Sequence, residues 1–308
     1  MEDSITLSGS DNLKTADAKA WMRFLQVFTL ALGSGLMLAG IIFFFAYNWD
    51  SLHRFVKMGI SVGLILAVFA VVMTVKMNDI TRKIMVSVLC GLVGVFWAIF
   101  GQVYQTTADS YVFFLTWACC ILVWVYAADF FPLWAIFVAL VSMGVIPLLD
   151  INEWFATLLM LYGVAWISFF IFAPKYLPHL SAPPSWFISV LSTIVFGVAV
   201  FVVCYVIITG DKVHNLWMAF AVVAATIWCS LKQKNIWLYS MLFIGALSVL
   251  ECVFFRWLLP VSGIMYQIML SVVALGGAAF AIVEQNNKWK QEKSGTSTKQ
   301  SVMDNGRQ

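Results

Sequence analysis

Residues 101–111, GQVYQTTADSY, form the densest run of uncharged polar side chains between two long apolar segments. A helix needs about 20 apolar residues to cross the ~30 Å hydrocarbon core of a bilayer, and the segments on either side come close to that length. The run therefore predicts the connection between two membrane-spanning helices. The rest of the chain repeats the same alternation of long apolar segments and short polar connections.

Composition points to the same class of protein. Hydrophobic residues make up 62% of the 308 residues, and charged residues make up 11%. Soluble domains carry about 25% charged residues, so this chain cannot cover itself with a polar surface. We therefore predict an all-α fold, a polytopic transmembrane helix bundle with the lipid bilayer as its main partner. We expect no nucleic-acid partner.

The length rule predicts about ten spanning helices. Several of the connections between them are very short, so sequential helices are expected to be antiparallel. The predicted spans are 24–47, 55–75, 84–103, 111–127, 131–149, 154–173, 186–208, 215–231, 236–259 and 261–283.

Lysine and arginine are distributed unevenly between the two sides of this arrangement. With a cytoplasmic N-terminus, only Arg54, Lys57, Lys212 and Arg256 of the 18 lysines and arginines fall outside. The positive-inside rule therefore favours ten spans with both the N and C termini cytoplasmic. Residues 101–111 then face outward.

A proline-rich stretch divides the predicted helices into six and four. It holds four of the seven prolines and cannot be helical through its middle. No cleaved signal is expected at the N-terminus, and the polar C-terminal end has the composition of a disordered tail. The expected segments are a cytoplasmic N-terminal segment (1–23), helices 1–6 (24–173), a cytoplasmic loop (174–185), helices 7–10 (186–283) and a disordered cytoplasmic tail (284–308).

Small residues recur at four-residue spacing in the first two spans. Such stripes let helix backbones approach closely, so we expect the first and second helices to pack tightly against each other. The residues are Ala31, Gly35 and Ala39 in the first span and Gly59, Gly63 and Ala67 in the second.

Polar side chains also gather in the connection between the first two spans, FFFAYNWDSLHRFVK at residues 43–57. Asp50 or Ser51 can cap the second helix, and Asp109 or Ser110 can cap the fourth. Because both connections face outward, the alternative is a pocket suited to a polar or cationic ligand. The candidate ligand-binding residues are Asn48, Asp50, Gln102, Tyr104, Gln105 and Asp109.

Both connections carry residues that match a known family pattern. The matching residues are Ala46, Asn48, Trp49, Asp50, Arg54, Lys57, Gly101, Gln102, Tyr104, Gln105, Asp109, Phe114, Leu115, Trp117 and Ala118. Over roughly residues 21–134 the chain resembles the bacterial predicted integral membrane proteins of domain of unknown function 2157. The resemblance implies a multi-pass protein of the bacterial inner (cytoplasmic) membrane, and it brings no established activity or substrate.

Motifs for catalysis and metal binding are absent from the sequence. It contains no G-x-S-x-G, no H-E-x-x-H and no phosphate-binding glycine loop. His53, His179 and His214 lie in connections on both sides of the membrane, and the six cysteines lie in apolar runs without a C-x-x-C pair. We therefore name no catalytic residue, metal site or cofactor, and an enzyme is not favoured.

Glu251 and Gln267 are candidate polar residues inside the membrane. Glu251 lies about 22 Å from the cytoplasmic edge of the ninth predicted span, and Gln267 lies at comparable depth in the tenth. An acid on a spanning helix is costly and marks a functional group, here a candidate for proton coupling. The alternative is that the ninth helix ends near Leu250 and that Glu251 is a solvated loop acid.

These observations favour an inner-membrane protein that binds or translocates a small polar or cationic solute through the outward-facing polar site. The alternative is a non-catalytic accessory or assembly subunit of a membrane protein complex. That subunit would contact a membrane protein partner, or a second copy of itself, through the same residues. A lipid-modifying enzyme would need an acid–base pair, which only the carboxylates named above could supply.

Overall fold

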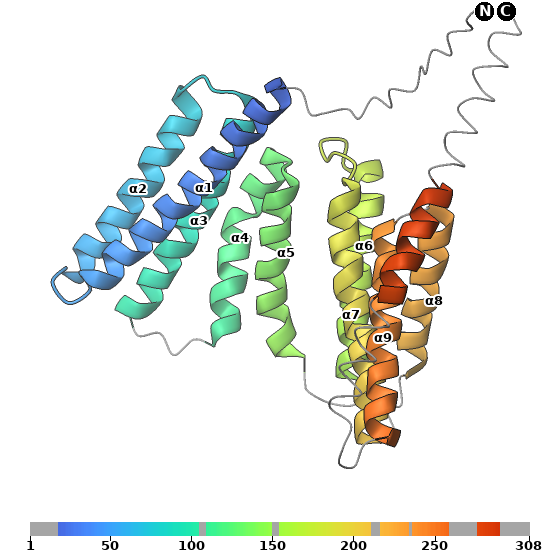
Figure 1. The fold of residues 1–308 in the computed structure, drawn as a ribbon. Helices are drawn as coiled ribbons and strands as arrows, with labels where there is room; N and C mark the ends of the chain where they lie inside the picture. The colour runs from blue at the N-terminus through green and yellow to red at the C-terminus, as the bar shows by residue number, and fades with distance from the viewer. Residues whose placement is uncertain are drawn as a thin grey trace, which may run out of the picture. The chain divides into compact units, whose positions relative to one another are not determined.

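Helices are the regular elements that the computed structural model describes, in residues 18–104, 109–149, 154–210, 216–233, 236–258 and 276–289 (Figure 1). The first part contains α1 (Ala18–Tyr47), α2 (Arg54–Thr74), α3 (Asp79–Val103), α4 (Ser110–Ala128), α5 (Phe131–Val145) and the 3-10 turn η1 (Ile146–Leu148). The second part contains α6 (Phe155–Tyr176), α7 (Ser185–Thr209), α8 (Leu216–Gln233) and α9 (Ile236–Leu258). Residues 276–289 form a further helical stretch.

Eight helices of the described residues are long and apolar enough to cross a membrane. They are α1 to α7 and α9, while α8 is apolar but shorter. The predicted polytopic helix bundle is thereby confirmed, and the protein is a multi-pass membrane protein in contact with the lipid bilayer. The tenth predicted span is described from residue 276 onward, and there the helix continues past Val283 to Trp289.

The chain forms two units, Met1–Gly144 and Val145–Gln308. In the first unit α3 is the central helix, because α1, α2 and α4 each pack against it. Eight residues of α3 are buried, compared with three of α4. The burial of α3 follows from its sequence, in which glycines at 91 and 94 leave room for the neighbouring helices.

The small-residue stripes of α1 and α2 do not make the tight contact that the sequence predicts. A Cβ atom added to Gly35, Gly59 or Gly63 would meet nothing within 4 Å. The close contacts lie on α3 instead, where Gly91 faces Leu38 of α1 and Gly94 faces Trp117 of α4. The prediction was wrong because four-residue spacing shows that a helix has a face of small side chains but not which helix packs there. In the structure α1 and α2 both pack against α3, which has smaller residues at the contact.

The second unit is arranged around α7, which packs against α6, α8 and α9. Gly163 of α6 faces Val195 of α7, and Gly245 of α9 lies against Phe196 and Val200 of α7. One turn beyond the thiols of Cys204 and Cys252, which are hydrogen-bonded, Arg256 Nη1 donates to the carbonyl of Ile208 at 2.8 Å. These contacts set the register between α7 and α9.

Several helix ends differ from the predicted caps. The residue before α2 is His53, which makes no side-chain cap, so neither Asp50 nor Ser51 caps this helix. The helix α6 continues through Pro174 to Tyr176, whereas the prediction ended it at residue 173. Proline is tolerated there because it lies in the last turn, where only one amide hydrogen bond to the preceding turn is lost.

Candidate functional site

The predicted ligand residues lie at one end of the first unit. The end of α1, the start of α2, the end of α3 and the start of α4 all meet at this end (Figure 1). Four of them, Asn48, Asp50, Gln102 and Tyr104, lie in or next to the α1–α2 turn and the last turn of α3, and Asp109 precedes α4. Gln105 lies outside the described residues.

Two of these side chains are used locally, in capping or stacking. Asn48 Nδ2 donates to the carbonyl of Phe44 at 2.9 Å, which satisfies an acceptor in the last turn of α1. The ring of Tyr104 packs against that of Phe100 with centroids 4.7 Å apart.

The two acids are exposed at this end. Asp109 occupies the N-cap position of α4, yet its side chain makes no capping hydrogen bond. Asp50 is likewise exposed in the α1–α2 turn. Both carboxylates therefore face the surroundings, and the prediction that the Asp109 side chain caps α4 is wrong.

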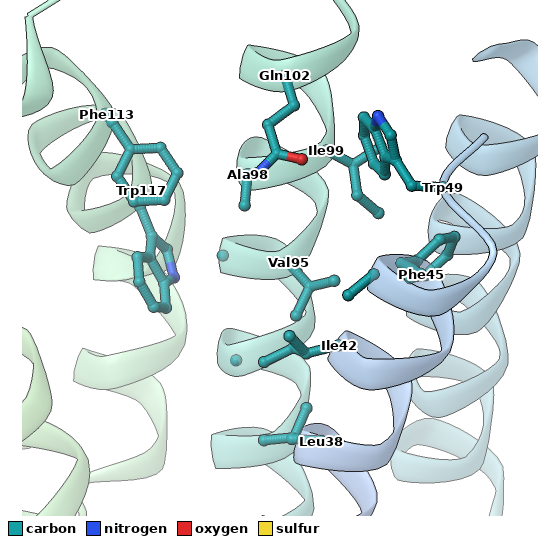
Figure 2. A pocket seen from close by; sticks show the side chains of 13 residues that line it. Leu38, Ile42, Phe45, Trp49, Val95, Ala98, Ile99, Gln102, Phe113 and Trp117 are labelled. Carbon is teal, nitrogen blue, oxygen red and sulfur yellow. The ribbon is translucent and has the colours of Figure 1, made fainter.

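A cavity of about 390 Å³ lies between α1, α3 and α4. Its walls are apolar along most of its length, and Gln102 supplies a side-chain amide at one end. Figure 2 shows Gln102 and Trp49 at that end, Leu38 at the other, and Phe113 and Trp117 of α4 across from α3. The lining residues are Leu38, Ile42, Phe45, Ala46, Trp49, Gly91, Gly94, Val95, Ala98, Ile99, Gln102, Phe113 and Trp117.

Two glycines of α3 shape this cavity. A Cβ atom on Gly91 would lie 2.8 Å from a methyl carbon of Leu38, and one on Gly94 would overlap the indole ring of Trp117. The indole of Trp117 is held in place because its Nε1 donates to the carbonyl of Cys90 at 2.9 Å. The glycines thus let α1 and α4 approach α3 at these two levels, and the space between the two contacts remains open.

Trp49 connects the cavity to a buried charge. Its indole lines the cavity, and the ammonium of Lys57 lies over the same ring, 3.7 Å from the centroid. Lys57 is only 6% exposed although it lies in the first turn of α2. A desolvated cation over a tryptophan face is held by about 2 kcal/mol.

Sequence reasoning did not predict this cavity. Of the five predicted ligand residues that the structure describes, Gln102 alone lines it. The prediction missed Gly91 and Gly94. It named Trp49 only as a residue that matches the family pattern, and it gave Lys57 no role beyond that match and its place among the outward cations. The signal for the glycines was present as G-x-x-G in the third span, a spacing that places both on neighbouring faces of one helix.

In the second unit the structure decides between two readings of Glu251. The helix α9 continues to Leu258, so the alternative that it ends near Leu250 is wrong. Glu251 is half-buried on this helix, and Gln267 lies outside the described residues. A role of Glu251 in proton coupling stays a prediction.

In the described ranges, no three His, Cys, Asp or Glu side chains gather closely enough to bind a metal ion. This end of the first unit offers an apolar cavity with one amide, an aromatic ring with its buried ammonium, and exposed carboxylates.

Comparison with known proteins gives one match. No curated protein and no solved structure matches the chain. Residues 8–134 match the model of a family described as predicted membrane protein (DUF2157). These residues carry α1 to α4 and all the residues that line the cavity. The resemblance inferred from the two polar connections is thereby confirmed over residues 8–134, the region that carries the cavity.

Proposed function

We propose that this is a bacterial inner-membrane protein that binds a small amphipathic solute and carries it across the bilayer. The apolar part of the solute occupies the cavity of the first unit. The observation that carries the proposal is the cavity itself, about 390 Å³ of space along α3 with apolar walls and one amide at its end. Small-molecule sites have volumes of roughly 300–1,000 Å³ and the same mixture of apolar walls and few polar groups.

The polar head of the solute is assigned to the end of the cavity where Gln102 lies. The amide of Gln102 both donates and accepts hydrogen bonds, so it can pair with most polar heads. Asn48, Asp50, Tyr104 and Asp109 lie at the same end and complete a polar rim. A sugar or an ion without an apolar part would place polar groups against side chains such as Ile42 and Val95, at a cost of several kcal/mol.

Blocking the cavity tests this proposal. Ala98 lines the cavity, so Ala98→Phe fills part of it, whereas Ala70→Phe places the same ring on the exposed face of α2. The probe is palmitoyl lysophosphatidylcholine, added to protein purified in a nonionic detergent. At a hundred times its dissociation constant it should stabilise the parent and Ala70→Phe by about 2.7 kcal/mol. Ala98→Phe should lose this stabilisation in thermal unfolding.

Equal stabilisation of Ala98→Phe and the parent would show that the cavity is not the binding site. A membrane protein that copurifies with the chain, with no response to the probe in any variant, would support the accessory or assembly role. Uptake of the probe into proteoliposomes then separates transport from binding alone.

A further inference from the structure

We infer that Lys57 makes the cavity selective for an anionic phospholipid, whose phosphate lies beside the buried ammonium while its acyl chain occupies the apolar walls. The inference rests on the proposed function and adds the sign of the head group. The sequence favoured a polar or cationic solute on the basis of Asp50 and Asp109. The buried charge in the structure is the ammonium of Lys57, whose sign is opposite to that of these two carboxylates.

The burial of Lys57 without an acid is the first part of the argument. No carboxylate of the described residues lies within 4.0 Å of its ammonium, and the first turn of α2 contains no acid. Removing an ammonium from water costs several kcal/mol, and a ring face recovers only part of that cost. The positive end of the α2 dipole at the same turn adds to the positive potential. A bound anion would compensate both.

The position of the ammonium is the second part. Lys57 contacts the ring of Trp49, and Trp49 lines the cavity at the end where Gln102 lies (Figure 2). Lys57 is not among the lining residues, so a phosphate that reaches its ammonium would lie at the edge of the Trp49 ring. There the ammonium and the Gln102 amide N–H could both donate hydrogen bonds to it. The charges of Asp50, Arg54 and Asp109 are exposed, so solvent and salt screen them. The buried charge therefore decides the sign.

The bilayer explains why the head group controls selectivity. An acyl chain that leaves the lipid for this cavity exchanges one apolar surrounding for another, with little hydrophobic gain. The acyl chain therefore contributes its fit to the cavity, and the head group determines which lipid binds more tightly. An ammonium that favours the anionic head group by about 1.4 kcal/mol separates the two lipids by about tenfold.

The test compares two lipids that share an acyl chain and a phosphate and whose head groups differ in net charge. Protein purified in nonionic detergent is titrated with palmitoyl lysophosphatidylglycerol and with palmitoyl lysophosphatidylcholine, and both dissociation constants are measured by native mass spectrometry. The parent should prefer the anionic lipid by about tenfold. Lys57→Met and Lys57→Gln should bring this ratio close to one, and Lys57→Arg should keep it. Arg54→Met is the matched control, since Arg54 is an exposed cation of the same helical turn.

An unchanged ratio in Lys57→Met and Lys57→Gln would overturn the inference. Gel filtration and thermal unfolding establish that each variant is folded. The ratio of dissociation constants should be the same in the two neutral variants. Binding of glycerol phosphate as tight as that of the lysolipid would also overturn it, because the ligand would then be a free phosphate. Ala98→Phe separates this inference from the proposed function. Weaker binding of both lipids in Ala98→Phe with an unchanged ratio in Lys57→Met removes only the role of Lys57.

Discussion

Gly94 sets how closely α4 approaches α3. The indole of Trp117 occupies the space that a side chain at position 94 would fill, and its N–H donates to Cys90 one turn earlier on α3. The contact therefore combines close packing with a buried hydrogen bond. Neither partner indicates this arrangement alone, because a glycine in a spanning helix and a tryptophan in the next are common in membrane proteins.

Gly94→Ala should destabilise the protein. The added methyl group overlaps the indole, which must move and weaken its hydrogen bond, at a cost of roughly 1–3 kcal/mol. Gly35→Ala is the control, because its Cβ meets nothing within 4 Å and alanine is favoured in a helix by up to about 1 kcal/mol. Thermal unfolding in detergent should show a lower midpoint for Gly94→Ala only. Equal midpoints for both variants would contradict the packing described here.

Glu251 gives a second prediction for a single residue. Its place on the continuous helix α9 keeps it a candidate for carrying a proton, since acids on spanning helices are costly and usually functional. Glu251→Gln should remove the pH dependence of lysolipid uptake into proteoliposomes while leaving the thermal midpoint close to that of the parent. An unchanged pH profile would exclude Glu251 from the mechanism.

Helix contacts in the second unit are specific enough to be tested by cross-linking. Cys204 on α7 and Cys252 on α9 are both reduced, and their thiols are hydrogen-bonded. Nearer the start of both helices, Phe196 and Val200 of α7 pack on Gly245 of α9. One turn after the cysteines, Arg256 of α9 donates a hydrogen bond to the carbonyl of Ile208 on α7. A shift of α9 by one turn would break all three contacts at once.

Oxidation should therefore link Cys204 to Cys252. In a variant that keeps these two cysteines alone, copper phenanthroline should give a peptide pair joined by a disulfide, with the loss of two hydrogens, detected by mass spectrometry. A variant that keeps Cys204 and Cys229 is the matched control and should remain reduced. A disulfide in the control and none between Cys204 and Cys252 would mean that the α7–α9 register is different.

The sequence predicted the helices closely because each span is a long apolar segment with polar ends. The predicted span 55–75 corresponds to α2 (Arg54–Thr74), and the predicted span 236–259 corresponds to α9 (Ile236–Leu258). The cavity could not be predicted in the same way. It depends on which faces of α1 and α4 meet α3, and the side chains around Gly91 and Gly94 decide this only after the helices are assembled.

The arrangement of the whole chain in the membrane stays a prediction, and the uneven distribution of lysine and arginine supports it. Ser51 lies in the α1–α2 turn and Lys76 lies between α2 and α3, and both are exposed. In a cysteine-free background, Ser51→Cys should react with an impermeant thiol reagent added to intact cells. Lys76→Cys should react only after the membrane is opened. Labelling of both from outside would contradict a cytoplasmic N-terminus.

The hydrogen bond between Trp117 and Cys90 also determines which of the helices that line the cavity can move away from α3. No water in the hydrocarbon core can replace the carbonyl acceptor, so α4 cannot part from α3 at this level without leaving the indole N–H of Trp117 unpaired. In the described residues, α1 touches α3 through packed side chains such as Leu38 on Gly91, with no hydrogen bond between the two helices. A ligand that enters sideways from the lipid would therefore pass a gate made by α1, with α3 and α4 as its fixed frame.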